Sequence, residues 1–229
     1  MLTTFLVPLS KHAPLEAPQS YIDSFNKTVS NSGRRTFAAM VRALDEGVGN
    51  VTAALEANGL TANNTIILFT TDNGGPADGF DTNYACNWPL RGTKRTLFEG
   101  GVRGVGLVTG AGIERSGDVL DGLLHVSDFL PSLLARVGAT AGPALRPGDG
   151  VDAWDYLSGK NDTSPRTELV HEAHPLGSTD GNGNALRVGD WKIVLRTGGM
   201  WAHGTNLGSN DGWFGGPGGS DPATGPYSL

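Results

Sequence analysis

Apolar residues in the first part of the chain recur in steps of three and four, which is the spacing of an amphipathic helix. The pattern runs from residue 34 to residue 58, and Gly59 follows at a position that favours helix termination. Asp45 and Glu46 lie on the polar side of the predicted helix, where we expect solvated carboxylates rather than a site. The apolar positions that define the stripe are Phe37, Met40, Val41, Leu44, Val48, Val51 and Leu55.

A run of apolar and β-branched residues, TIILFT at residues 65–70, predicts a buried strand directly after this helix. Helix and strand together form one α/β unit. A second run at residues 104–108 predicts another buried strand. The first strand ends in Asp72, Asn73 and two glycines. Because ligands bind at the carboxyl edge of the strands in open α/β sheets, this is the first candidate site in the chain.

The Asp72-Asn73 pair has two interpretations. Asp-Asn-Gly-Gly on its own is more often an ordinary turn than a metal site. Carboxylate and amide oxygens are nevertheless the hard ligands that Ca²⁺ and Mg²⁺ prefer. Lys94 follows on a segment rich in arginine and glycine, and residues 99–103 form a charged, glycine-containing turn. The four-residue motif by itself therefore leaves both interpretations open.

The segment at residues 118–138 contains a second predicted helix, which begins after Ser127. Ser127 is a suitable N-cap for it, and Asp128 is favourable in its first turn, where a negative charge is stabilised by the helix dipole. We expect the apolar side chains of this helix to face the core. They are Phe129, Leu130, Leu133, Leu134 and Val137.

Strands are predicted in the last third of the chain. Residues 167–171 predict one strand, and residues 186–195 predict a hairpin on the two-residue turn Gly189-Asp190. From residue 197 onward Gly, Asn, Ser and Pro dominate, and we assign no chemistry to this segment.

Charge and composition exclude several classes of protein. The chain has 229 residues, a formal net charge of −6 and no basic patch, which argues against a nucleic-acid partner. No apolar run is long enough to span a membrane, and the first ten residues lack the basic start and cleavage site of a signal peptide. Asn-x-Thr triplets permit a lysosomal or secreted glycoprotein. They begin at Asn26, Asn50, Asn63 and Asn161.

Three blocks together resemble the type I sulfatases, and arylsulfatase B-like members in particular. They are DNGG at residues 72–75, NWPLRG at residues 87–92 followed by Lys94, and EGGVRG at residues 99–104. The segment that begins with His12, HAPLEAP, is similar to a His-Ala-Pro segment of the same family. The resemblance implies an alkaline-phosphatase-like α/β/α sandwich, here incomplete, with a small C-terminal antiparallel sheet. It divides the chain into residues 1–164 and residues 165–229.

The same resemblance implies hydrolysis of sulfate esters, including those of sulfated sugars, with Ca²⁺ as cofactor. Asp72 and Asn73 would be two ligands of this ion, and Lys94 and His12 would bind sulfate oxygens. His125 and Asp128 would have structural roles, as would Arg91 and Arg103.

In the sulfatases the nucleophile is a formylglycine made from the cysteine of a Cys-x-Pro-Ser-Arg motif. Cys86 is followed by Asn87, Trp88 and Pro89, so we interpret it as an incidental loop cysteine. We therefore expect this chain to correspond to the second half of a sulfatase and to be inactive alone. A non-catalytic module that binds sulfated glycans is the alternative.

Overall fold

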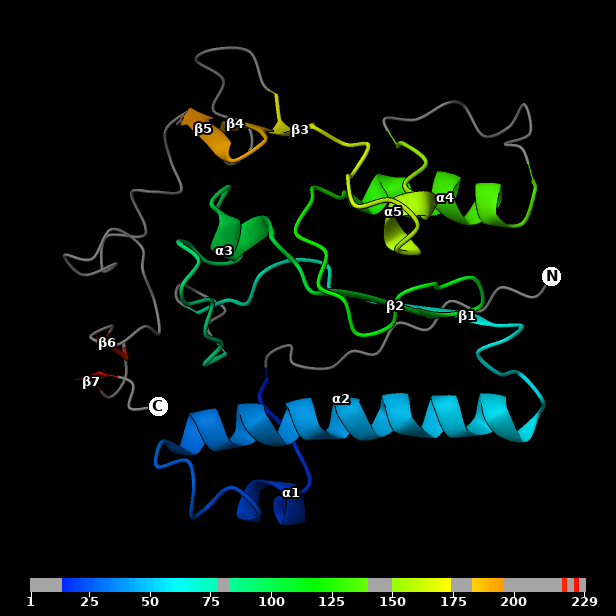
Figure 1. The fold of residues 1–229 in the computed structure, drawn as a ribbon. Helices are drawn as coiled ribbons and strands as arrows, with labels where there is room; N and C mark the ends of the chain where they lie inside the picture. Colours follow the sequence, from blue (N-terminus) through cyan, green and yellow to red (C-terminus); the bar gives the residue numbers. More distant parts are fainter. Residues whose placement is uncertain are drawn as a thin grey trace. The chain divides into compact units, whose positions relative to one another are not determined.

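The computed structural model describes residues 14–77, 83–139, 150–173 and 183–195, with the short strands β6 (Ser220–Asp221) and β7 (Gly225–Pro226). Figure 1 shows the elements along the chain. They fall into two compact units that are interleaved in sequence. Unit 1 comprises residues 1–59, 71–104 and 198–229, and unit 2 comprises residues 60–70 and 105–197. The predicted boundary between residues 164 and 165 remains a prediction.

Unit 1 contains the predicted amphipathic helix as α2 (Ser32–Ala57), preceded by the short helix α1 (Gln19–Asp23). The side chain of Asn31 accepts a hydrogen bond from the Arg34 N–H (2.9 Å) and so caps the first turn of α2. Gly59 follows the helix with φ +74°, the left-handed conformation predicted for the terminator. The helix and its end are therefore confirmed.

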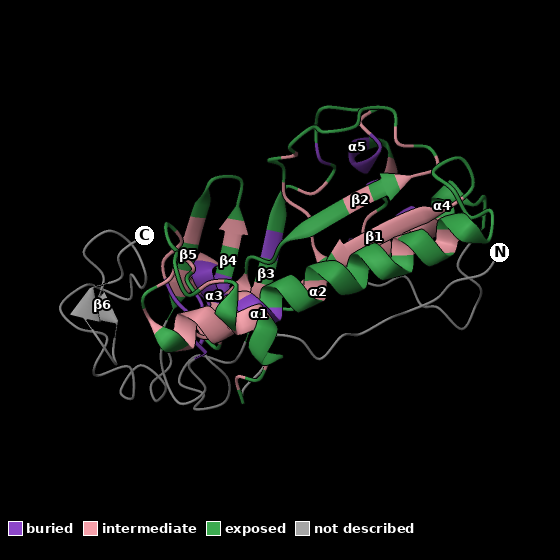
Figure 2. Cartoon of the chain, turned by 90° about the horizontal axis from the view of Figure 1, so that it is seen from below, coloured by how far each residue is buried: buried purple, intermediate pink, exposed green. Residues whose placement is uncertain are grey.

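The apolar stripe of α2 is less buried than its periodicity suggests. Only Ala39 and Met40 of the helix are buried, whereas Val41, Val48 and Val51 are exposed. Figure 2 shows exposed residues along most of α2. None of the helices in the described part of the chain combines the length and the hydropathy of a membrane-spanning segment.

Unit 2 contains both predicted strands, although neither is buried as expected. β1 (Ile66–Thr70) pairs antiparallel with β2 (Gly106–Gly110), and Leu68 lies opposite Val108. The residues of β1 are mostly half-buried, and Leu107 in β2 is exposed. β2 begins two residues later than predicted, because residues 103–105 are irregular and regular pairing starts only at Gly106.

The second predicted helix begins differently from the prediction. A 3₁₀ turn, η1 (Val126–Asp128), precedes α4 (Phe129–Arg136). His125, and not Ser127, caps this turn, since its Nδ1 accepts from the Ser127 N–H (3.3 Å) while its own N–H donates to Asp128 Oδ2 (2.8 Å). The prediction of Ser127 as the N-cap was therefore wrong.

Asp128 is the centre of this part of unit 2. Its side chain is completely buried and also accepts a hydrogen bond from the Val151 N–H (2.9 Å). Arg166, 38 residues away in sequence, donates to both of its oxygens, from Nε (2.7 Å) and from Nη2 (2.5 Å). Burial alone would raise the pKa of Asp128, but the hydrogen bonds from Arg166, Val151 and His125, with the charge of Arg166, bring that pKa below its usual value. The predicted structural role of Asp128 is confirmed.

The prediction that the apolar side chains of α4 face the core is confirmed only in part, because Phe129, Leu133 and Leu134 are half-buried and the one buried residue of the helix is a serine. Ser132 is completely buried, whereas Leu130 is 52% exposed and Val137 is 46% exposed. The Ser132 hydroxyl donates to the Asp128 carbonyl (2.6 Å) and accepts from the Ala153 N–H (2.9 Å). This contact draws the main chain before α5 (Trp154–Leu157) close to α4. A small residue such as serine suits this close approach, which accounts for the buried position of Ser132.

The predicted strand and hairpin form a three-stranded antiparallel sheet with the order β3-β4-β5. The strands are β3 (Glu168–Glu172), β4 (Asn184–Val188) and β5 (Trp191–Leu195). Gly189 in the hairpin turn has φ +52°, and Arg187 Nε donates to its carbonyl oxygen (2.9 Å). The small antiparallel sheet expected from the sequence is therefore present.

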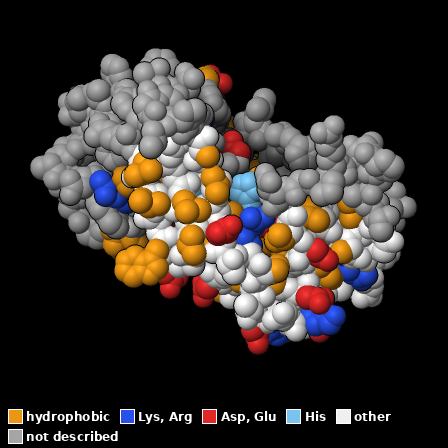
Figure 3. All heavy atoms as spheres, turned by 90° about the horizontal axis from the view of Figure 1, so that it is seen from above, with side chains coloured by type: hydrophobic (Ala, Val, Ile, Leu, Met, Phe, Trp, Pro, Cys, Tyr) orange, Lys and Arg blue, Asp and Glu red, His pale blue; other side chains and the backbone are white. Residues whose placement is uncertain are grey.

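One face of this sheet is apolar and exposed. Val170, Leu186 and Ile193 lie opposite one another across the three strands, and Val188 lies opposite Trp191, which is 85% exposed. Figure 3 shows hydrophobic side chains gathered on the surface over this sheet. Residues of the other face, such as Leu169 and Ala185, are buried. Exposed apolar patches of this kind favour association, so we expect the chain to self-associate through this face.

Replacing Val188 and Ile193 together with threonine is therefore expected to reduce aggregation. Threonine keeps the β-branched shape that favours a strand, and exposed substitutions usually change stability by less than about 0.5 kcal/mol. Fluorescence of a dye that binds apolar surfaces and light scattering on heating measure the effect. Val194→Thr, at a half-buried position of β5, is the control and should lower the thermal midpoint. Equal destabilisation by both changes would contradict the assignment of an exposed face.

Candidate functional site

Two of the resemblance blocks are packed against each other in unit 1 through their glycines. The Gly74 N–H donates to the Gly101 carbonyl (2.9 Å), and a side chain at Gly74 would overlap the carbonyl oxygen of Gly100. The predicted charged turn is the single helical turn α3 (Glu99–Val102). The segment after Asp72-Asn73 thus touches α3 main chain to main chain, which explains why neither block has side chains at these positions.

The carbonyl oxygen of Gly75 joins the third block to this pair. It accepts hydrogen bonds from Asn87 Nδ2 (2.7 Å), from the Thr93 hydroxyl (3.2 Å) and from the Lys94 N–H (3.2 Å). The backbone of Lys94 is therefore hydrogen-bonded to Gly75, the residue two positions after Asn73. Asp72, Asn73 and Lys94, which are distant in sequence, belong to one cluster of loops in unit 1.

The side chains of Asp72 and Asn73 leave oxygen atoms available to a cation. Asp72 Oδ1 accepts from the Asn73 N–H (2.8 Å), and Asn73 Nδ2 donates to the Gly74 carbonyl (2.7 Å). Asp72 Oδ2 and Asn73 Oδ1 accept no hydrogen bond from any described residue. Because Asp72 is exposed and Asn73 is half-buried, both oxygens suit a hard divalent cation.

These two ligands are fewer than the six to eight oxygens that Ca²⁺ takes. In the described part of the chain, no group of three or more His, Cys, Asp or Glu residues could hold a metal ion. The donor set therefore fits part of a cation site and does not complete one. His12, the other predicted sulfate contact, lies outside the described residues.

Two further predicted roles concern residues near this cluster. The Arg91 guanidinium lies 4.1 Å from the centre of the Phe98 ring, a cation–π contact that agrees with a structural role. Cys86 is exposed in the loop before Asn87, as expected of an incidental loop cysteine.

No role was predicted for Asn87 or for the residues that anchor its loop. Asn87 lies within the second resemblance block, so membership of that block was the available signal. Arg34 is a different case, because it lies in the first turn of α2 and donates from Nη1 to the Tyr84 carbonyl, 50 residues away. Nothing in the local sequence pattern indicates such a contact.

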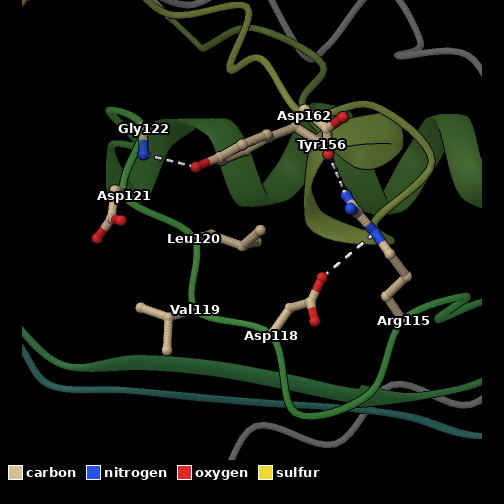
Figure 4. Close-up of a pocket in the computed structure, with 8 residues that line it drawn as sticks. All are labelled: Arg115, Asp118, Val119, Leu120, Asp121, Gly122, Tyr156 and Asp162. Atoms are coloured by element: carbon tan, nitrogen blue, oxygen red, sulfur yellow. Dashed lines mark hydrogen bonds and ion pairs between the residues drawn. The ribbon is translucent and has the colours of Figure 1, made fainter.

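Unit 2 contains a separate pocket of about 210 Å³, shown in Figure 4. Arg115 lies in it between Asp162, 2.7 Å from Nη2, and Asp118, 3.3 Å from Nε. The hydrogen bond with Asp162 raises the pKa of Arg115. Because carboxylates already neutralise this guanidinium, the pocket is a poor site for a sulfate group. None of the predicted site residues lines it.

The sequence profile of the sulfatase family matches residues 3–139, a span that includes all three resemblance blocks and His12. The chain belongs to the sulfatase family. It is 36% identical to mouse (Mus musculus) Arylsulfatase J over 81% of this chain and 30% of that protein. It is 30% identical to human (Homo sapiens) N-acetylgalactosamine-6-sulfatase over 62% of this chain and 25% of that protein.

A solved structure supports the fold of this sulfatase chain. The crystal structure of Ps i-CgsB in complex with k-i-k-neocarrahexaose matches 80% of this chain and 39% of that one, with a TM-score of 0.67 and 28% identity. The alkaline-phosphatase-like α/β fold expected from the sequence is thereby confirmed. The chain spans about a third or less of the length of the curated relatives described above.

Proposed function

We propose that the chain forms part of an enzyme that hydrolyses sulfate esters of sugars. The observation that carries the proposal is the hydrogen bond from the Lys94 backbone N–H to the Gly75 carbonyl (3.2 Å), which holds the main chain of Lys94 against the loop of Asp72 and Asn73. Metal ions and positive side chains both stabilise the negative charge of an anionic ester as it reacts, and this cluster offers ligands for the first and a lysine for the second. The oligosaccharide complex of the structural relative supports a sugar as the substrate class.

In this proposal Asp72 and Asn73 are two of the Ca²⁺ ligands, and the remaining ligands come from residues outside the described cluster. When bound, the cation supplies Lewis-acid stabilisation of negative charge on the sulfate. The carboxylate of Asp72 contributes charge to the site, and the amide oxygen of Asn73 contributes a neutral ligand. The hydrogen bond from Asn73 Nδ2 to the Gly74 carbonyl (2.7 Å) restrains the orientation of this amide.

Lys94 and His12 are proposed to contact the sulfate oxygens. The ammonium group of Lys94 would donate hydrogen bonds to the oxygens on which charge develops as the ester bond breaks. His12 would donate to the sulfate or to the leaving oxygen, since an imidazole can hold or release a proton near neutral pH. The four exposed Asn-x-Thr asparagines are compatible with a lysosomal or secreted protein, which is our proposal for localisation.

A non-catalytic module that binds sulfated glycans is the second candidate. It is favoured by the sequence around Cys86, the one cysteine in the chain, which does not form a Cys-x-Pro-Ser-Arg motif. Binding of a sulfated sugar without turnover by a longer polypeptide that contains this chain would support it over the enzyme.

Titration of the chain with Ca²⁺ tests the proposed metal ligands. Because the described residues offer two oxygen ligands, we expect little or no binding, with a dissociation constant weaker than about 10⁻⁴ M. Asp72→Ala should abolish any heat that calorimetry detects. Asp45→Ala, which removes an exposed carboxylate on α2, is the matched control and should leave it unchanged. A submicromolar site would contradict the expected weak binding, and one that survives Asp72→Ala would also overturn the metal assignment.

A further inference from the structure

Asn87 connects the loop of the proposed metal ligands to the loop of Lys94. Its Oδ1 accepts from the Gly75 N–H (3.0 Å), and its Nδ2 donates to the Gly75 carbonyl (2.7 Å) and to the Gly92 carbonyl (3.1 Å). Gly75 lies two residues after Asn73, and Gly92 lies two residues before Lys94. The Asn87 side chain therefore bonds to both loops. In each loop it does so two residues from a proposed site residue, Asn73 in one and Lys94 in the other.

The chemistry of these bonds requires an amide. Both acceptors of Nδ2 are carbonyl oxygens, so the group facing them must donate two hydrogen bonds, whereas the group facing the Gly75 N–H must accept one. A carboxylate has the same shape but offers only acceptors, and it would place a negative charge against two carbonyl oxygens. Asparagine at this position thus satisfies all three partners, and aspartate would satisfy one.

The segment that carries Asn87 is itself anchored to α2. Tyr84, three residues earlier, has φ +63°, and its carbonyl accepts a hydrogen bond from Arg34 Nη1. Its ring occupies the space where a side chain at Gly33 would lie. A non-glycine residue in the left-handed region is held there only by its surroundings, and here the first turn of α2 provides them. The loop that carries Asn87 is therefore attached to the helix α2 rather than to another loop.

We propose that Asn87 is a positioning residue, which fixes the distance between Lys94 and the Asp72-Asn73 pair without itself touching metal or sulfate. Its effect on sulfate binding rests on the proposed function, whereas its effect on the two loops does not. The two consequences are measured separately.

Amide hydrogen exchange in the 229-residue chain measures the effect on the loops. In Asn87→Asp the amides of Gly75 and Lys94 should exchange at least about tenfold faster, while amides in the middle of α2 keep their rates. Asn50→Asp, an exposed change of the same kind on α2, is the control and should alter neither loop. Unchanged exchange at Gly75 and Lys94 would overturn the proposal.

A second variant covers the case in which Asn87→Asp does not fold. Asn87→Ser removes the amide without adding charge, and we expect it to fold with the same local increase in exchange at Gly75 and Lys94. If both variants instead unfold throughout, with α2 amides exchanging as fast as the loops, Asn87 is a general structural residue and the proposal fails.

Titration with inorganic sulfate measures the apparent affinity for sulfate, a quantity that would not change if Asn87 had a purely structural role. The Lys94 amide resonance should shift with sulfate in the parent chain, and Asn87→Ser should weaken the apparent affinity while its thermal midpoint stays near that of the parent. Equal affinity in the two chains would overturn the positioning role. Absence of any shift in the parent would count against the proposed sulfate site, and the exchange rates alone would then decide the role of Asn87.

Discussion

Replacing Lys94 with alanine is expected to lower the turnover of an aryl sulfate by about 10²–10³-fold, the usual loss when one donor to a developing negative charge is removed. The assay uses a sulfatase in which this chain replaces the matching segment of mouse Arylsulfatase J, to which it is 36% identical. The hybrid is produced together with the enzyme that generates formylglycine. His12→Ala should also lower turnover steeply, because both side chains are proposed to contact the sulfate.

The physical reason for so large a loss is that a hydrogen bond to a developing charge strengthens as the reaction proceeds. The Lys94 backbone is held on the Gly75 carbonyl (3.2 Å), so truncation of its side chain should leave the loop in place and remove the ammonium group alone. The loss should therefore appear chiefly in kcat rather than in the thermal midpoint.

Arg187→Ala is the control for the Lys94 variant. Arg187 is in β4 and donates to the Gly189 carbonyl in the hairpin turn (2.9 Å), so its removal should leave turnover nearly unchanged. Full activity of Lys94→Ala would refute its role. Hydrolysis by the 229-residue chain unaided, abolished by Cys86→Ser, would instead require Cys86 as a nucleophile and a different mechanism.

Replacing Arg166 with methionine should have the largest effect on stability, a loss of about 3–5 kcal/mol in the free energy of unfolding. The change would leave the completely buried Asp128 carboxylate without the guanidinium that now donates to both of its oxygens. Urea denaturation of the 229-residue chain measures the loss.

Two further variants distinguish the effect of breaking the buried Arg166–Asp128 ion pair from the effect of removing any positive charge. Arg115→Met breaks exposed ion pairs with Asp118 and Asp162, and should have little measurable effect on urea denaturation. Adding Asp128→Asn to Arg166→Met should recover part of the lost stability, because the isolated charge is then removed. A small loss in Arg166→Met, similar to that in Arg115→Met, would contradict the assignment.

The ion pair between Asp128 and Arg166 also predicts how the stability of the chain depends on pH. The pKa of Asp128 is lower in the folded chain than its usual value, so the carboxylate stabilises the folded state at every pH above the unfolded pKa of about 3.9. This contribution is lost as the pH falls from there through the folded pKa. The Arg166→Met chain should therefore show a weaker decline of stability over that acid range than the parent.

Elements that depend on neighbouring residues could be predicted from the sequence. The steps of three and four before Gly59 predicted α2 almost to its ends, because helix periodicity and a left-handed terminator are local properties. The β4-β5 hairpin followed from Gly189-Asp190 between two apolar runs for the same reason. The depth of burial could not be obtained in this way, since the exposed valines of α2 and Leu107 in β2 have the same local pattern as buried ones.

By itself the sequence determined the family, the order of α2, β1, β2 and the strands of the small sheet, and the identity of Asp72, Asn73 and Lys94 as candidate residues, because these depend on spacing and on contiguous blocks. Only the tertiary structure decided that Gly75 joins the blocks through Asn87 and Lys94, and that Arg166 neutralises Asp128 across 38 residues. Such contacts join groups that are far apart in sequence: amides with a main-chain carbonyl in the first case, and a guanidinium with a carboxylate in the second. Carbonyls and carboxylates recur along the chain, so no local pattern indicates which carbonyl a distant amide will bind or which carboxylate a distant guanidinium will bind.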